Sequence, residues 1–386
     1  MHSAVLMGCV MPSLPVAAQS WSRTGAPTNA WSAAAASADG SRLAAVCGYP
    51  GDAIYTSADY GATWVSNNAP AIPWTAVASS ADGAKLVAAG GGAIYTNSGT
   101  AWALAYAAPK SGPSYEQNIA FVATSADGGI LVAASSFGDP IYSPKPIILV
   151  STNAGATWTS ATNSPSDGQG WTAVASSADG SKLAASTLLG GYFASVNAGA
   201  TWSSNTVAPF RSLAMSADGN RLAGATPVGL FSSANGGATW APLVSAPAMT
   251  NRVACSTNGL VLFGLAKTNI YCSFNAGTNW LTNSAPAANW SAIAVSKNGL
   301  RGVASVAGGG LYTLNPPPLQ LASSNQTVNL LWSANYTALG VSLVQSTNLA
   351  GANWTAVPGV PGVDGAMSRV SIPATNRQQF FRLQSP

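Results

Sequence analysis

The chain has 386 residues, of which 7% are charged, and a formal net charge of +4. Soluble domains carry roughly 25% charged residues, so the composition favours a compact exported β protein over a helical cytosolic enzyme. The Lys and Arg residues are scattered and form no basic run, which argues against nucleic-acid binding. The single histidine is His2. Ser-His-Asp and Cys-His nucleophiles, His-bearing zinc sites and imidazole bases are therefore excluded from residues 3–386.

Residues 1–18 are expected to be a secretory signal peptide. The apolar stretch from Ala4 to Ala18 ends in "VAA", which allows cleavage before Gln19. No Lys or Arg precedes that stretch, and "LMGC" is faintly similar to a lipoprotein box, so the true start codon and the lipidation of Cys9 stay open. We expect export to the periplasm, cell surface or medium of a bacterium. Later apolar runs are too brief to span a bilayer. The other cysteines are expected to be buried free thiols, because their number is odd: Cys47, Cys255 and Cys272.

One phrase recurs seven times between residues 31 and 304. "WTAVASSADGSKLAA", from Trp171, is a typical copy. Each copy contains an Asp or Asn in a tight turn, which serves as its anchor for alignment. The anchors are Asp39, Asp82, Asp127, Asp179, Asp218, Asn258 and Asn298. These anchors are 39 to 52 residues apart, and a period near 40 with several short strands per repeat is typical of propeller blades. The sequence therefore predicts an all-β, seven-bladed β-propeller.

Each repeat is expected to supply four strands. The tryptophan phrase forms an inner strand, the Asp-Gly turn leads to a second strand, and a third strand and a hairpin lead to the fourth. The last repeat ends near Gly308 to Pro318 without a fourth strand. Trp21 and Trp31 are ten residues apart, as are Trp64 and Trp74. We therefore predict that the N-terminal segment completes the seventh blade and removes an exposed sheet edge.

The predicted organisation has four parts. Residues 1–18 are the signal peptide, 19–314 the propeller, 315–318 a stiff proline linker, and 319–386 a C-terminal β module. "TVNLLWSA", "VSLVQSTN", "NWTAVPGV", "SRVSIP" and "QFFRLQ" are predicted strands of that module, which is expected to be a small β-sandwich. Its role stays open.

Five of the repeats have a second signature in the hairpin before the fourth strand, as in "SADYGATW" at residues 57–64. The signature is Ser, any residue, Asp or Asn, any residue, Gly, any residue, Thr and Trp. It resembles the BNR or Asp-box repeat of sialidase-like, sortilin-like and photosystem II assembly factor-like propellers. That resemblance implies a propeller and a structural role for the boxes. The paired residues are Asp59 and Trp64, Asn153 and Trp158, Asn197 and Trp202, Asn235 and Trp240, and Asn275 and Trp280.

The chemistry of sialidases is not implied. That family needs three arginines that hold a carboxylate, a Tyr–Glu pair and an acidic Asp, and its Phe/Tyr-Arg-Ile-Pro stretch is absent. Arg42, Arg221 and Arg301 follow the repeated turn, where other repeats have Lys, which indicates solvated turns. Arg211 and Arg252 stand near inner-strand starts and could face the axis, but two arginines do not make a triad.

The candidate site is the rim opposite the Asp-Gly turns, where blades three and four have long connections at 103–118, 135–145 and 159–170. Extra loops on a rigid scaffold commonly carry function, although surface insertions are also tolerated without one. The candidate binding residues there are Tyr115, Glu116, Asp139, Tyr142, Lys145 and Asp167. Glu116 with Asp139 or Asp167 is the candidate acid/base pair.

Tryptophans at inner-strand starts form a second candidate. Trp74 and Trp171 begin two of these strands near the same rim, where sugar rings could stack on them. Repeated Trp at one structural position is also typical of packing between blades.

The sequence predicts an exported, non-catalytic binding or scaffolding monomer, whose ligand is a glycan or a protein at the rim of blades three and four. No cofactor, metal or nucleic-acid partner is expected. The alternatives are a glycoside hydrolase that uses the rim carboxylates and a structural cell-surface protein. They stay open because the fold alone does not determine the function.

Overall fold

The computed structural model describes residues 19–48, 53–99, 101–109, 118–136, 146–161, 170–247, 252–266, 268–316, 319–324, 327–334, 341–346, 353–359, 361–364, 367–373 and 380–384. The chain divides into two compact units, Gln19–Pro316 and a second unit that contains Pro317–Pro386. The described residues include no helix with the length and apolar character needed to cross a membrane.

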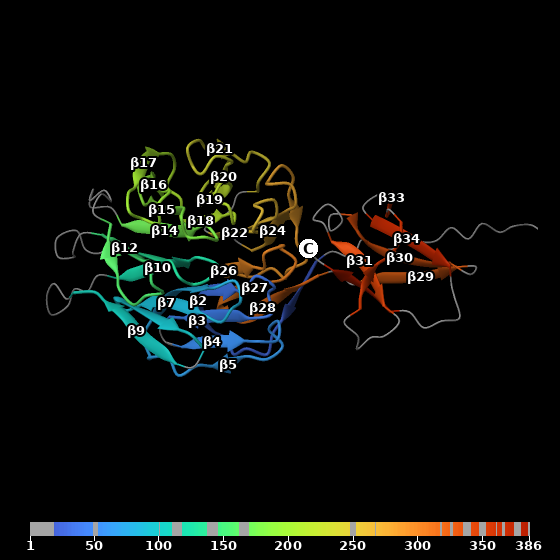
Figure 1. The fold of residues 1–386 in the computed structure, drawn as a ribbon, viewed down its shortest axis with the longest axis horizontal. Coiled ribbons are helices and arrows are strands. Elements are labelled where there is room, and N and C mark those ends of the chain that lie inside the picture. Colours follow the sequence, from blue (N-terminus) through green and yellow to red (C-terminus); the bar gives the residue numbers. More distant parts are fainter. Residues whose placement is uncertain are drawn as a thin grey trace, which may run out of the picture. The chain divides into compact units, whose positions relative to one another are not determined.

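In the first unit, seven groups of four antiparallel strands follow one another along the described chain (Figure 1). The first strands of groups 1 to 7 are β2 (Asn29–Ala36), β6 (Trp74–Ser79), β10 (Ile119–Thr124), β14 (Trp171–Ser176), β18 (Ser212–Met215), β22 (Arg252–Cys255) and β26 (Trp290–Val295). The second strands are β3 (Leu43–Cys47), β7 (Leu86–Gly90), β11 (Leu131–Ser135), β15 (Leu183–Thr187), β19 (Leu222–Thr226), β23 (Leu262–Leu265) and β27 (Gly302–Gly309).

The third strands are β4 (Ile54–Ser57), β8 (Ala93–Asn97), β12 (Ile148–Ser151), β16 (Gly191–Ser195), β20 (Gly229–Ser233), β24 (Ile270–Ser273) and β28 (Leu311–Asn315). The fourth strands are β5 (Val65–Ser66), β9 (Trp102–Ala107), β13 (Thr159–Ser160), β17 (Ser203–Thr206), β21 (Ala241–Pro242), β25 (Leu281–Thr282) and, for group 7, β1 (Ser20–Arg23). Groups 2 to 6 are separate sheets, whereas a short pairing of β2 with β27 joins groups 1 and 7 into one eight-stranded sheet.

Burial changes from strand to strand within a group. All residues of second strands such as β11, β15 and β19 are buried, whereas the residues of β13, β17 and β21 are exposed. Figure 1 shows β5, β9, β17 and β21 at the periphery of this unit and the first strands near its centre. Sheets that pack face to face around a common axis, with each fourth strand outermost, form a β-propeller.

The Asp-Gly turns join each group to the next through the backbone. Seven N–H···O bonds of 2.6 to 2.8 Å run Ala38 to Ala81, Ala81 to Ala126, Ala126 to Ala178, Ala178 to Ala217, Ala217 to Thr257, Thr257 to Lys297, and Lys297 back to Ala38. Because the last bond returns to the first turn, the turns form a closed ring.

Strand β1 joins the two ends of this unit. It pairs antiparallel with β28, with Trp21 opposite Leu314 and Ser22 opposite Thr313. Gln19, just before it, is buried; its side-chain N–H₂ donates to Gly299 O at 3.1 Å, and Ser284 Oγ donates to Gln19 O at 2.7 Å.

The described cysteines of the first unit are free thiols. Cys47 and Cys272 are buried and Cys255 is half-buried. Burial raises the pKa of the Cys255 and Cys272 thiols to about 12, so neither forms a reactive thiolate at neutral pH.

The described residues of the second unit form two antiparallel sheets. One has the order β29 (Gln320–Ser324), β30 (Thr327–Ser333), β34 (Met367–Pro373) and β33 (Gly362–Asp364). The other has the order β32 (Thr355–Ala356), β31 (Ser342–Ser346) and β35 (Phe380–Gln384). Leu330 and Trp332 on the first sheet and Leu343 on the second are buried.

Candidate functional site

The Asp-box side chains hold their own hairpins. Asp59 Oδ1 accepts hydrogen bonds from the Thr63 backbone N–H at 2.9 Å and from Ser57 Oγ at 2.7 Å, and Asp59 Oδ2 accepts one from Thr63 Oγ1 at 2.6 Å. The four asparagine boxes accept the equivalent backbone N–H at 2.9 Å, at Asn153, Asn197, Asn235 and Asn275. These side-chain oxygens therefore already accept hydrogen bonds from within their own hairpins.

The box tryptophans close the same hairpins. Their indole N–H groups donate to the carbonyl oxygen of the box glycine at 3.0 to 3.1 Å in Trp64, Trp202, Trp240 and Trp280. The fifth, Trp158, lies against Tyr106, with ring centroids 6.4 Å apart.

Each box also contacts the Asp-Gly turn of its own group. The backbone N–H beside the box glycine donates to that turn at 2.8 to 2.9 Å, from Tyr60 to Ser41, Ala154 to Gly129, Ala198 to Ser181, Gly236 to Asn220 and Ala276 to Leu260. Boxes and turns therefore share one rim, and the other connections emerge on the opposite rim.

The turn aspartates are held as anions by similar bonds. Hydrogen bonds from the Ser177 side chain and from the side chain and backbone of Ser181 lower the pKa of Asp179 to about 2. Hydrogen bonds from the side chain and backbone of Thr63 and from the Ser57 side chain lower the pKa of Asp59 to about 2. A carboxyl with so low a pKa is a poor proton donor near neutral pH.

Replacing Asp179 by Asn should reduce the acid sensitivity of folding. A pKa lowered in the folded state stabilises the fold above the unfolded value of about 4, and that contribution is lost as the pH falls from about 4 to 2. At pH 7, Asp179→Asn should change the free energy of unfolding by less than about 0.5 kcal/mol. Asn258 already holds an equivalent turn, accepting from Ser256 Oγ at 2.7 Å.

Urea unfolding of the variant and the parent at pH 7 and pH 3 tests this. The stability lost between the two pH values should be smaller in Asp179→Asn. Equal losses would contradict the assignment of the carboxylate to the turn.

The tryptophan expectation must be corrected. Trp74 and Trp171 are 0% and 1% exposed, so neither presents a ring face to a sugar. Trp171 instead lies in a buried cluster between groups 3 and 4, which includes Ile148 of group 3 and Phe193 of group 4. The packing alternative is right for these residues, because a large ring at an inner-strand start fills the space between neighbouring sheets.

The other predicted site residues, Tyr115, Glu116, Asp139, Tyr142, Lys145 and Asp167, lie outside the described residues. The structure does describe the ends of their connections. Asn118 and Ser136 flank two of them, and they are joined by a Ser136 N–H to Asn118 O bond of 2.9 Å and an Asn118 Nδ2 to Ser136 Oγ bond of 3.1 Å. Gly170, at the end of the third connection, accepts the Leu188 N–H at 3.2 Å. All three connections therefore meet the sheets at the rim opposite the Asp-boxes.

A cavity of about 190 Å³ lies between the first strands of all seven groups. Its described lining is mostly small or apolar, such as Ala33, Ala76 and Ala173. The charged residues of the described lining are Arg211 and Arg252, which stand near the starts of β18 and β22. The sequence alone did not reveal the cavity around them, because its walls come from seven separate repeats.

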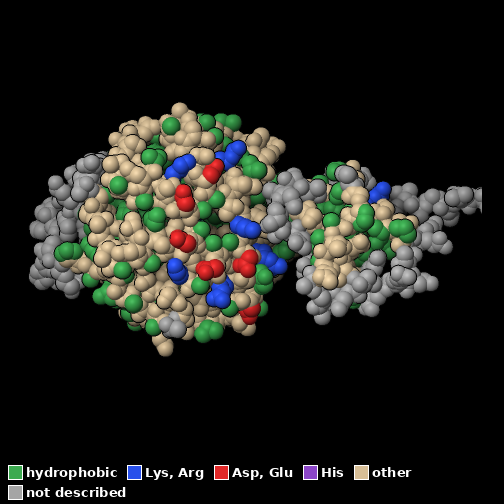
Figure 2. Space-filling model, in the orientation of Figure 1, with side chains coloured by type: hydrophobic (Ala, Val, Ile, Leu, Met, Phe, Trp, Pro, Cys, Tyr) green, Lys and Arg blue, Asp and Glu red, His purple; other side chains and the backbone are tan. Residues whose placement is uncertain are grey.

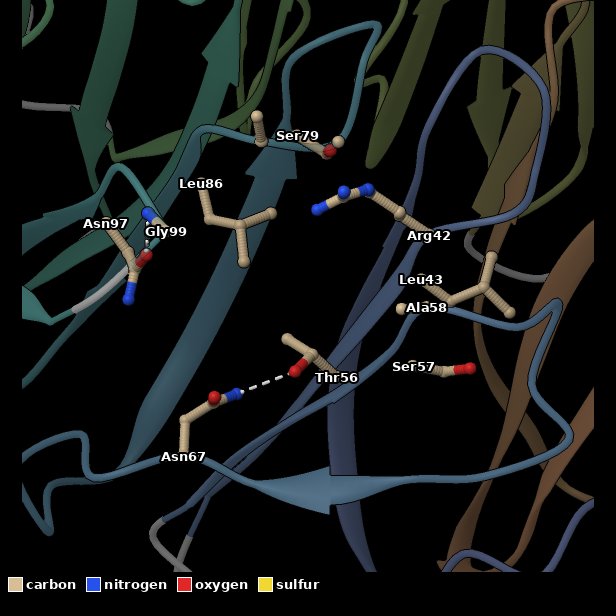
Figure 3. Close-up of a pocket in the computed structure, with 12 residues that line it drawn as sticks. Arg42, Leu43, Thr56, Ser57, Ala58, Asn67, Ser79, Leu86, Asn97 and Gly99 are labelled. Carbon is tan, nitrogen blue, oxygen red and sulfur yellow. Dashed lines mark hydrogen bonds between the residues drawn. The ribbon is translucent and has the colours of Figure 1, made fainter.

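A polar groove of about 150 Å³ lies between groups 1 and 2 (Figure 3). Arg42 extends across it toward Ser79 and Leu86, while Asn67 Nδ2 donates to Thr56 Oγ1 at 3.0 Å. A β carbon at Gly83 would lie 2.6 Å from Arg42 Cβ, so the arginine stem packs on the turn of the neighbouring group. The equivalent Lys85 Nζ donates to Asp127 O at 2.8 Å. Residues at this position join neighbouring groups, which favours a structural role for the groove.

The face of the molecule in Figure 2 carries charges of both signs, and its acidic and basic side chains are intermixed. Among the described residues, no group of three or more His, Cys, Asp or Glu could hold a metal ion.

Comparisons with known proteins bear on the fold. No protein-family model and no curated protein sequence matches the chain. Among solved structures, the chain is similar to YCF48 from Cyanidioschyzon merolae, with a TM-score of 0.55 and 16% sequence identity over 76% of this chain and 98% of that one. This likeness shows the fold: the chain has the all-β architecture of several four-stranded antiparallel sheets, as in the BNR-type propeller of YCF48.

Proposed function

We propose that the chain is an exported, non-catalytic binding or scaffolding protein that holds a glycan or protein ligand at the rim of groups 3 and 4. The observation that carries the proposal is the bonded pair Asn118 and Ser136, which brings the ends of two long connections together on a rigid sheet. Binding residues commonly lie on loops that such a scaffold positions.

The proposal includes a particular architecture. The seven groups are blades of one ring over residues 19–314, and β1 completes the seventh blade. Residues 315–318 are a linker, and 319–386 form a small β-sandwich. The closed ring of turn hydrogen bonds and the β1–β28 pairing support this arrangement.

A non-catalytic role is supported by the positions of the acidic residues. The chain has 11 of them, and six are turn or box carboxylates that accept hydrogen bonds from their own loops: Asp39, Asp59, Asp82, Asp127, Asp179 and Asp218. A glycosidase needs two carboxyls about 5 to 10 Å apart on either side of a sugar bond. The other carboxylates of the propeller, from which such a pair would have to come, are Asp52, Glu116, Asp139 and Asp167.

Binding is tested with the purified full chain on a glycan array and by affinity capture of proteins, comparing the parent with Tyr115→Ala and Tyr142→Ala. Loss of a specific ligand in these variants, with unchanged unfolding, supports the rim site. Val196→Ala is the control, because Val196 is exposed in the Asp-box hairpin of group 4, on the other rim.

Catalysis is tested on a panel of polysaccharides with the parent and Glu116→Gln. Hydrolysis that disappears in Glu116→Gln would overturn the non-catalytic proposal in favour of a glycoside hydrolase. Cell fractionation with and without residues 319–386 separates a soluble exported protein from a structural component held at the cell surface.

A further inference from the structure

Gln19 is the residue that removal of residues 1–18 would leave at the N-terminus. Residues 1–18 lie outside the described residues, whereas Gln19 is described and only 5% exposed. Its side-chain Nε2 donates to Gly299 O in the turn of group 7 at 3.1 Å. Its carbonyl oxygen accepts from Ser284 Oγ, just after the fourth strand of group 6, at 2.7 Å. Side chain and backbone of this residue are therefore both held between two groups.

In group 7, Gln19 takes over a contact that an Asp-box makes elsewhere. In the five groups with a box, a backbone N–H of the hairpin donates to the turn of the same group, as from Tyr60 to Ser41. Group 7 has no such hairpin, because its third strand ends at Asn315 and its fourth strand is β1. The Gln19 amide supplies the contact to the turn instead. The N-terminus of a processed chain is therefore fixed against this rim.

The two groups that hold Gln19 offer no carboxylate to a positive N-terminus. The sequence has no Asp or Glu between Asp218 and Asp364, and none in β1, so groups 6 and 7 lack acidic residues. Their turns carry Asn where the turns of the other five groups carry Asp. The turn that accepts the Gln19 amide also contains Lys297 and Arg301. An ammonium group at this position would have positive neighbours and no acidic partner in either group.

A free α-ammonium group therefore fits this position poorly. An α-amino group has an ordinary pKa of about 7.7–8.0, so it is mostly protonated near neutral pH. Burying an unpaired charge costs free energy, because the protein interior does not replace the lost hydration. An N-terminus without charge avoids that cost, and an N-terminal glutamine can reach such a state through its own side chain.

We propose that Gln19 of the processed chain is converted to pyroglutamate before group 7 closes. The α-amino nitrogen attacks the side-chain amide carbon Cδ, and a C–N bond forms. The bond from Cδ to Nε2 breaks, one amine proton passes to the leaving nitrogen, and ammonia departs. The step needs no oxidant, reductant or cofactor. The resulting lactam is uncharged and retains one N–H donor and one carbonyl acceptor, in place of the Nε2 donor that Gly299 O loses.

Mass spectrometry of the chain recovered from outside the cytoplasm of a bacterial host tests the proposal, which rests on the export proposed above. The chain should start at Gln19, lack the mass of one ammonia molecule, and have no free α-amine in its N-terminal peptide. An exported chain that starts at Gln19 with a free amine, or that starts at another residue, overturns the pyroglutamate and leaves export standing. A chain retained in the cytoplasm with residues 1–18 attached overturns both.

The variant Gln19→Ala tests the role of charge. Its N-terminus cannot cyclise, so it should carry an α-amine at the same position. Burial disfavours the protonated form of that amine, so the stability of the variant relative to the parent should rise as the pH increases from about 6 to about 8. Residues 19–386 contain no histidine that would titrate in this range. Ser20→Ala, at the exposed next position, is the control and should follow the parent. The same pH dependence in Gln19→Ala and the parent would refute the proposal.

Discussion

Trp21→Ala is expected to lower the free energy of unfolding by about 3–5 kcal/mol, the range for truncation of a buried aromatic side chain. Trp21 is 7% exposed, and its ring centroid lies 6.2 Å from that of Trp290 in the same group. Because β1 comes from the opposite end of the unit, losing this contact weakens the pairing that joins the two ends.

Denaturant unfolding followed by circular dichroism measures this loss. Ser20→Ala is the control, since Ser20 is exposed on the same strand and its loss should cost less than about 0.5 kcal/mol. A Trp21→Ala variant as stable as the parent would show that the N-terminal strand does not hold the seventh group.

Trp171→Ala should cost a similar amount, again about 3–5 kcal/mol. The Trp171 ring packs against Phe193 edge-on at 5.2 Å and fills the space between groups 3 and 4. Trp171→Phe should cost less, because it keeps most of the apolar volume and removes an indole N–H that has no hydrogen-bond partner among the described residues.

The comparison of unfolding with binding separates the two roles considered for this residue. If Trp171 only packs between the sheets, Trp171→Phe should bind any rim ligand as the parent does, and Trp171→Ala should be strongly destabilised. A Trp171→Ala variant with parental stability and lost glycan binding would restore the stacking hypothesis.

The repeats predicted much of the fold because they carry local signals. The Asp-Gly anchors marked the turns, and the equal spacing of Trp21–Trp31 and Trp64–Trp74 indicated the strand that β1 forms beside β28. The segments "TVNLLWSA" and "SRVSIP" also indicated β30 and β34 in the second unit, whereas β29 (Gln320–Ser324) and β33 (Gly362–Asp364) were not predicted.

The candidate sites were less predictable, for physical reasons. Burial of Trp74 depends on the neighbouring sheet, which a single repeat does not reveal. The turn ring likewise depends on bonds between repeats, such as Lys297 to Ala38, that have no sequence signature. The axial cavity required the relative placement of seven strands before Arg211 and Arg252 could be assigned to one space.

The most direct test of the closed ring is a disulfide between β1 and β28. Ser20 lies opposite Asn315 in the register, and opposed residues of antiparallel strands have Cα atoms about 4.5–5.5 Å apart, within the range that a disulfide bridges. We expect Ser20→Cys with Asn315→Cys to oxidise to one intramolecular bond, detected by mass spectrometry of the linked peptides. The control pair, Ser20→Cys with Ser160→Cys, should not link. Free thiols in the first pair, or links only between separate chains, would contradict closure by the N-terminal strand.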